Sequence, residues 1–507
     1  MADVAIPVSP LSPTPVRGSL DDRFDTSHLT KNLQRRTLRG GAVTLSSQGA
    51  KFLLRMGSTA VLARLLTPAD FGLIAMITVV SGFVEMFKDA GLSTATVQRE
   101  KITHAQVSTL FWINVALSIG VMIVVAALAP AIAWFYDEPR LTAITFALSG
   151  TMVFGGLAVQ HQALLRRRME FGRLAAIEIT SLVAGVIAAF VMAWNDCGYW
   201  SLVGMTAVTA ATTAVMSFAM SGWAPGLPRR DSDVWPLLAF GSNLAGASTF
   251  NYVTRNADNV IIGLLHGASA LGVYSRGYNL FLMPLNQFLA PISAVAVPAL
   301  SRTTDRPDVF KKLLLQKSYF VVFCVTLATG FSFCAAPELV QIVLGPGWEQ
   351  AATIVRCLAV GGAVYGTNVA GSWVCTTHGW TNRQLRVAIV AAPAYTASYA
   401  IGSLFGPAGV ACGFSATCCL LRYPVFRYLL SNSPIRPGDL ILPLFRVGMI
   451  AAIAALGAIA LPFLLHFEGG VALAVKAGGY GFLIAGACLT GLLSLPHFGQ
   501  RSGRHDD

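Results

Sequence analysis

The chain has 507 residues, of which 54% are hydrophobic and only 12% are charged, and its mean hydropathy is +0.62. Because about a quarter of the residues in soluble proteins are charged, this composition excludes an ordinary soluble domain and indicates a polytopic membrane protein. The net charge of +12 comes largely from short segments between apolar stretches, which predicts membrane topology and no nucleic acid partner. The nine cysteines form no CxxC motif and no cluster with histidine, so we expect no disulfide and no metal site.

Residues 1–38 contain Pro7, Pro10, Pro13 and Pro15 and no apolar core, which predicts a disordered tail. A series of apolar stretches follows, each long enough to cross the roughly 30 Å hydrocarbon core of a bilayer as a helix. These stretches lie near 41–66, 71–97, 106–135, 141–165, 173–194, 199–222, 236–265, 270–298, 313–344, 350–376, 385–405, 407–430, 441–465 and 470–495. We therefore predict an all-α polytopic membrane protein with about 14 transmembrane helices.

The basic residues outside these stretches alternate with the predicted crossings. Nearly all fall in the first tail, the last tail and every second connecting segment, whereas Arg140 alone falls in the opposite segments. By the positive-inside rule, both the tail at 1–38 and the tail at 497–507 are then cytoplasmic. An odd number of crossings would break this alternation, so the charge pattern supports about 14 helices independently of hydropathy.

Two segments in different halves of the chain have similar sequences. VLARLLTPADFGL at 61–73 matches VIIGLLHGASALGV at 260–273 with one inserted residue. Six predicted helices separate the two segments, and because six is even, both copies have the same orientation in the membrane. This predicts two parallel six-helix repeats, at 39–225 and 235–432, related by an axis along the membrane normal, with two additional transmembrane helices at 440–496.

The first predicted helix carries charge at its middle. Gln48, Lys51 and Arg55 fall on one face of a helix, together with Thr44 and Ser58. A central Lys or Arg costs roughly 3 kcal/mol on insertion scales, so this face does not contact lipid. Two interpretations remain: the cations pair with buried carboxylates for structure alone, or they line a water-filled cationic transport cavity. We favour the cavity and assign these three residues to substrate binding.

The second predicted helix places Glu85, Lys88 and Asp89 on one polar stripe. A carboxylate in a low-dielectric setting holds its proton more tightly, so this group is a candidate for coupling transport to an H⁺ or Na⁺ gradient. The alternative is a buried ion network that only fixes helix packing.

The second repeat also carries charged and polar residues on one face of each of its first two predicted helices. Asn251, Arg255 and Asp258 share a face of the seventh predicted helix, and Arg276 and Asn279 share a face of the eighth. Asn251, Arg255, Arg276 and Asn279 are further candidates for substrate binding, and Asp258 is a further candidate for ion coupling. The charge symmetry is approximate, because Arg255 aligns with Met56 rather than with Arg55.

The sequence contains no GxxxxGK[ST] loop for a nucleotide, so any transport would be secondary or would depend on a partner. We assign no catalytic residue and expect no bound cofactor. Every predicted non-cytoplasmic segment is short, which leaves little room for the catalytic loop of a membrane enzyme.

Four segments carry a family resemblance: LLTPADFGL at 65–73, DAGLSTATVQR at 89–99, GYWSLV at 198–203 and NADNVIIGLLHGASALGVYSRGYNLFLMPLNQFLAPISAVAVPALSR at 256–302. They resemble Wzx-type polysaccharide flippases of the multidrug/oligosaccharidyl-lipid/polysaccharide exporter superfamily. The resemblance implies two six-helix lobes forming a V, a cationic central cavity and two added C-terminal helices. It also implies a non-enzymatic transporter that moves an undecaprenyl-diphosphate-linked oligosaccharide across the bacterial inner membrane for exopolysaccharide or lipopolysaccharide biosynthesis.

The partners implied by the resemblance are the lipid-linked oligosaccharide, the membrane, and the polymerase and glycosyltransferases of a polysaccharide pathway. The family has no strict sequence motif whose functional residues can be assigned to positions in this chain. The candidate site residues therefore rest on the helical projections alone. One alternative is a drug or cation exporter of the same superfamily, for which a carboxylate-lined cavity is expected. The other alternative, from a different class, is a membrane glycan polymerase or ligase. A major-facilitator protein is disfavoured because VQREKITH at 97–104 lacks that family's GxxxDRxGRR pattern.

Overall fold

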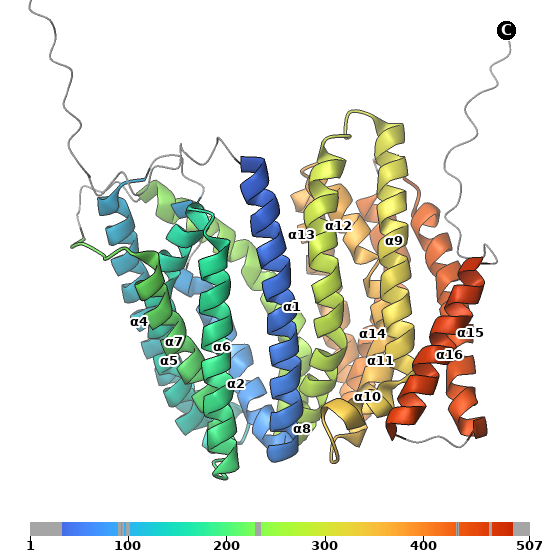
Figure 1. Cartoon of the computed structure of the whole chain (residues 1–507), viewed down its shortest axis with the longest axis horizontal. Helices are drawn as coiled ribbons and strands as arrows, with labels where there is room; N and C mark the ends of the chain where they lie inside the picture. Colours follow the sequence, from blue (N-terminus) through green and yellow to red (C-terminus); the bar gives the residue numbers. More distant parts are fainter. Residues whose placement is uncertain are drawn as a thin grey trace, which may run out of the picture.

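The computed structural model describes residues 33–89, 93, 96–97, 102–228, 235–431, 433, 435–465 and 469–489. All regular secondary structure within these ranges is helical, and the helices stand side by side in two groups with a further pair at one edge (Figure 1). Most of the predicted N-terminal tail and the whole predicted C-terminal tail lie outside the described residues.

The first group forms the N-terminal lobe. It consists of α1 (Leu33–Leu65), α2 (Pro68–Asp89), α4 (His104–Phe135), α5 (Arg140–Arg167), α6 (Phe171–Trp194) and α7 (Trp200–Ser221). The start of α4 shows how local sequence sets a boundary, because Thr103 and Gln106 form a capping box: the Thr103 hydroxyl accepts from the Gln106 backbone N–H, and the Gln106 side chain accepts from the Thr103 N–H.

The second group forms the C-terminal lobe. It consists of α8 (Trp235–Ser301), α9 (Pro307–Cys334), α10 (Ala336–Val343), α11 (Glu349–Tyr365), α12 (Asn368–Thr377), α13 (Thr381–Ser403) and α14 (Gly406–Leu429). The long α8 is two helices that meet at Gly267, whose φ of 76° and ψ of −176° suit glycine. The predicted ninth span is divided into α9 and α10, and the predicted tenth into α11 and α12.

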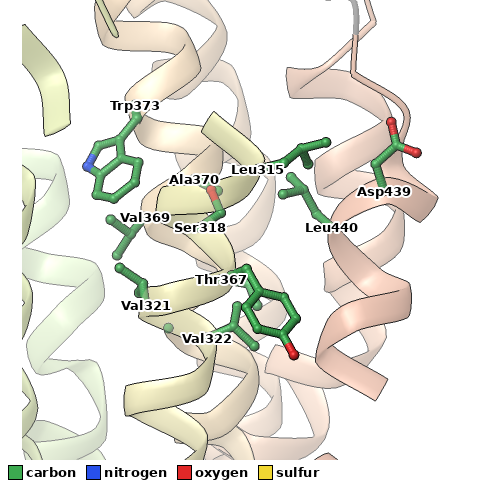
Figure 2. Close-up of a pocket in the computed structure, with 12 residues that line it drawn as sticks. Leu315, Ser318, Val321, Val322, Thr367, Val369, Ala370, Trp373, Asp439 and Leu440 are labelled. Carbon is green, nitrogen blue, oxygen red and sulfur yellow. The ribbon is translucent and has the colours of Figure 1, made fainter. Parts of the chain in front are cut away.

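The last pair, α15 (Pro437–Leu465) and α16 (Gly469–Leu489), lies along the outer side of the C-terminal lobe (Figure 1). Leu440 of α15, Leu315 of α9 and Trp373 of α12 line one narrow space (Figure 2). About 10 Å³ is free there, which is at the limit of what a single water needs. Lys311 of α9 and Asp439 of α15 also form an ion pair at 2.9 Å. The pair is therefore packed against the lobe rather than tethered loosely beside it.

The fold agrees with the predicted all-α membrane architecture of about 14 transmembrane helices. By length and composition alone, 7 helices of the described part qualify as membrane spans. Among the helices that do not qualify, α1 carries Lys51 and Arg55, and α8 consists of two segments that meet at Gly267. In the turn between α4 and α5, Arg140 donates two hydrogen bonds of 2.8 Å to Glu138, which lower the pKa of that carboxyl.

The two lobes meet where the repeated segments cross. A Cβ added to Gly72 of α2 would lie 1.7 Å from the Ala268 carbonyl oxygen, and one added to Gly272 would lie 1.8 Å from the Pro68 carbonyl oxygen. In the repeat alignment Gly72 corresponds to Gly272, and Pro68 corresponds to Ala268. The two contacts are thus copies of each other about the axis that relates the lobes, as in an isologous interface. We call these four residues the lobe contact.

We expect Gly72→Ala to weaken the lobe contact, because the added methyl group would meet a backbone oxygen that has no rotamer to change. Overpacking of this kind costs about 1–3 kcal/mol. Gly150→Ala is the matched control, since Gly150 lies within α5 with nothing near its added Cβ within 4 Å, and alanine there stabilises the helix by up to about 1 kcal/mol. Thermal unfolding of the purified variants measures both effects, and equal melting temperatures would contradict the close approach.

Candidate functional site

The polar face of α1 is divided between a paired and an exposed cation. Lys51 donates a hydrogen bond to Glu178 of α6, and the two form an ion pair in which the Lys51 side chain is 13% exposed. Gln48 and Arg55, one turn to either side, are exposed. Lys51 therefore has the carboxylate partner that the structural interpretation requires, and its part in substrate binding stays a prediction.

Arg255 is exposed on the first segment of α8, one residue away from the repeat equivalent of Arg55. Both arginines lie well inside their helices, and a charged side chain at that depth is too costly to leave in lipid. Water must therefore reach both positions. Asn279, on the second segment of α8, is exposed as well.

Asp258 is on the same helix as Arg255 and is buried, with only 3% of its surface exposed. The Tyr274 hydroxyl donates to one carboxylate oxygen at 2.8 Å, and the Asn259 backbone N–H donates to the other at 2.8 Å. Tyr278 stacks on Tyr274 with ring centroids 5.9 Å apart. The carboxylate is thus held inside the C-terminal lobe, between the two segments of α8.

Arg276 lies next to the lobe contact. Its guanidinium carbon is 4.8 Å above the centroid of the Phe71 ring, a cation–π arrangement that links α8 to α2. Its Nε atom is buried and has no hydrogen-bond partner among the described residues. Phe71 in turn meets Trp348 edge to face, with centroids 5.5 Å apart. Arg276 is therefore a cation at the seam between the lobes.

Further contacts hold the lobes together at the same end of the molecule. Arg64, near the end of α1, donates to the Ile342 carbonyl at 2.6 Å and to the Val343 carbonyl at 3.4 Å, at the C-terminus of α10. A cation is favourable there because the last carbonyls of a helix lack partners. The buried Trp348 indole donates to the Ala63 carbonyl at 3.0 Å. The end of α1 is thereby joined to the C-terminal lobe.

Four predicted site residues lie outside the described side chains. They are Glu85, Lys88 and Asp89 on α2 and Asn251 on α8. The structure brings Arg276 to the lobe contact and Asp258 to Tyr274, whereas it directs Lys51 into the N-terminal lobe.

Sequence reasoning missed several partners. Glu178 is a single carboxylate in an apolar span, and Lys51 is a cation in another apolar span. Pairing such isolated opposite charges is the signal that predicts their contact. No comparable signal identifies Trp348 or Tyr274, because aromatic residues are common throughout apolar helices.

These features define a class: a polytopic membrane protein with a two-lobed transporter fold and exposed arginines inside its spans. A family model described as polysaccharide biosynthesis protein matches residues 61–353, and the chain belongs to that family. Lipopolysaccharide biosynthesis protein WzxC of Escherichia coli (strain K12) is 27% identical over 314 residues, 60% of this chain and 62% of the relative. Succinoglycan biosynthesis transport protein ExoT of Rhizobium meliloti (strain 1021) is 27% identical over 335 residues, 65% of this chain and 67% of the relative.

Solved structures share the fold at low sequence identity. The structure of the lipid II flippase MurJ in an inward closed conformation has a TM-score of 0.69 and 13% identity, and the match covers 88% of this chain and 98% of that one. An inward-facing multidrug transporter of the MATE family has a TM-score of 0.56 and 12% identity, covering 78% of this chain and 94% of that one. These identities establish likeness of fold alone.

The two cations of α1 are expected to respond differently to substitution. Lys51→Ala leaves Glu178 without its partner, and since Glu178 is 39% exposed, we expect a loss of about 1–3 kcal/mol rather than the larger cost of a fully buried pair. Arg55→Ala removes an exposed side chain and should leave the melting temperature unchanged. Melting temperature and membrane level report both effects. Lys51→Ala/Glu178→Ala should recover most of the loss, and identical behaviour of Lys51→Ala and Arg55→Ala would contradict the pairing.

Proposed function

We propose that this protein is a flippase that moves an undecaprenyl-diphosphate-linked oligosaccharide repeat unit across the inner membrane for exopolysaccharide or lipopolysaccharide biosynthesis. It works as a secondary transporter by alternating access and not as an enzyme. The family match and the names of the relatives support this proposal, as does the fold shared with a lipid II flippase.

The observation that carries the proposal is the pair Arg55 and Arg255, exposed at matching depth on equivalent helices of the two lobes. A pyrophosphate needs cations in water, whereas a polyprenyl tail needs lipid, and helices that present arginine within a membrane span meet the first need. Arg276 supports the same assignment, because its guanidinium at the seam of the lobes has one donor, Nε, without a partner in the part of the chain that the structure describes. These arginines would repel the substrate of a cation exporter.

The lobe contacts suggest how access alternates. With the termini in the cytoplasm, the end that holds the lobe contact, Arg64 and Trp348 is periplasmic, so the described conformation is closed on that side. The headgroup would enter from the cytoplasm and meet the exposed arginines. Release would require the lobes to part at the lobe contact. The polymerase and glycosyltransferases of the same pathway are the proposed protein partners.

We expect a strain lacking this protein to lose surface polysaccharide and to accumulate lipid-linked repeat units in the cytoplasmic leaflet. Complementation with Arg55→Ala/Arg255→Ala should restore the membrane level of the protein but not export. Each charge-assisted contact to phosphate contributes about 1.5–3 kcal/mol, so loss of one lowers occupancy about 10- to 100-fold. The control is Arg427→Ala, an exposed arginine in the last turn of α14. Normal export in the double variant would refute the anion site, and chain extension by the purified protein would indicate a polymerase.

We further propose that Asp258 couples transport to an H⁺ or Na⁺ gradient, because it is a buried carboxylate next to the exposed Arg255. A carboxylate in this setting can exchange a proton or cation only when the packing around it opens. Asp258→Asn should therefore retain binding of the lipid-linked substrate while making flipping in proteoliposomes insensitive to an imposed gradient. Tyr274→Phe, which removes one donor to the carboxylate, should shift the pH dependence without abolishing it. An unchanged gradient response in Asp258→Asn would exclude this role.

A further inference from the structure

A groove of about 450 Å³ runs between α13 and α14, away from the lobe contact. Its size falls within the range of roughly 300–1,000 Å³ typical of small-molecule sites. The residues that line it are Arg386, Val387, Ile389, Val390 and Ala391 of α13 and Leu421, Pro424, Val425 and Tyr428 of α14. The walls are aliphatic, and the single charged residue, Arg386, stands at one end.

Helix packing explains why the groove forms in this half of the two helices. In the other half the backbones touch: a Cβ on Gly402 would lie 2.4 Å from the Gly409 carbonyl oxygen, and one on Gly413 would lie 2.6 Å from the Ser398 carbonyl oxygen. In the half of the helices that contains Arg386, larger residues such as Val390 and Leu421 take the place of the glycines. Pro393 of α13 and Pro424, which lies in the groove half of α14, also remove backbone hydrogen bonds from their helices, which allows the helices to part.

The groove opens on the outer surface of the C-terminal lobe. Tyr395 and Tyr399 occupy the opposite face of α13 and pack into the hydrophobic core of that lobe. On the groove side, Val390 is 73% exposed and Ile389 is 49% exposed. Exposed aliphatic side chains within a membrane span face lipid, so this site is separate from the exposed arginines of α1 and α8.

Arg386 stands at one end of the groove, and Arg383 lies one turn earlier on α13, outside the groove lining. Arg386 Nη1 donates to the Tyr428 hydroxyl at 3.4 Å, which spans the gap between α13 and α14. Arg383, one turn earlier, stacks on Trp380 at 4.2 Å and donates to the Ser431 hydroxyl at 3.3 Å. A tryptophan with basic neighbours is typical of the membrane–water interface. With the termini in the cytoplasm this end of α13 faces the cytoplasmic leaflet, where anionic lipids gather.

We propose that this groove binds one anionic glycerophospholipid of the cytoplasmic leaflet. An acyl chain lies along Val387, Val390 and Val425, and the phosphate meets Arg383 and Arg386. The occupant follows from complementarity: an aliphatic channel with cations confined to its interfacial end matches a molecule with an anionic head and a long aliphatic chain. The bound lipid would fill the gap that remains between α13 and α14 beside the close backbone contacts at Gly402 and Gly413.

The test uses the full chain in vesicles that contain phosphatidylglycerol with a photoreactive acyl chain. Labelling should map to peptides that contain 386–391 and 421–428. Unlabelled phosphatidylglycerol should compete at least about 10-fold better than phosphatidylcholine with the same chains, as expected for a charge-assisted contact. Arg383→Gln/Arg386→Gln should lower the labelling about 10-fold. Arg427→Gln is the matched control, because Arg427 is exposed near the same end of α14 but does not line the groove.

A second variant tests the apolar part without changing the charge. Val390→Trp fills the groove at a lipid-exposed position, so it should reduce labelling while the melting temperature stays at the wild-type value. Equal competition by phosphatidylglycerol and phosphatidylcholine would overturn the proposal, as would the same loss of labelling in Arg427→Gln. Displacement of the probe by polyprenyl phosphate at lower concentration than by phosphatidylglycerol would also overturn it, since the groove would then belong to the transported molecule.

Discussion

Backbone contact between α2 and α8 sets the geometry on which the rest of the molecule depends. Gly72 lies against Ala268 and Gly272 lies against Pro68, so neither position tolerates a side chain without moving a helix. Because the two contacts are equivalent by the internal repeat, they lie about the axis that relates the lobes. This places the seam between the lobes at the turn after α1 and at the break within α8. Arg64, Arg276, Phe71 and Trp348 then gather around the same seam.

Charge inside the membrane is handled in two ways, and the difference separates structure from function. Lys51 with Glu178 and Lys476 with Glu338 are cations matched to carboxylates, and each pair joins helices within the body of the protein. Such pairs offset the cost of burying charge but do not by themselves stabilise the fold strongly. Arg55 and Arg255 are instead exposed on helices of different lobes. Exposure of this kind is the condition that the proposed binding of a mobile anion requires.

Sequence periodicity predicted the helices and the repeat because both depend on local patterns. Hydropathy averaged over a whole span did not locate the breaks at Ala335 and at Gly366–Thr367, although Pro337 and the Gly-Thr-Asn run at 366–368 are local signals of a helix boundary. The helical projection placed Lys51 and Arg55 on one face, and among the side chains that the structure describes only Lys51 has a carboxylate partner. That outcome depends on Glu178, which lies 127 residues away and whose position is set by the packing of α6 on α1. Local patterns thus identify which face of a helix is polar, while tertiary packing decides which charges are paired.

The short helix α10 connects the seam to the last two helices. At its C-terminus, the final carbonyls accept hydrogen bonds from Arg64 of α1. Nearer its start, Glu338 pairs with Lys476 of α16 at 2.5 Å, with the two side chains 13% and 9% exposed. A buried pair is costly to break because each partner left alone is an uncompensated charge. The hydrogen bonds of Arg64 to neutral carbonyls are therefore the weaker of the two connections of α10. If the lobes part as proposed, we expect α10 to stay with α16 and α1 to separate from it.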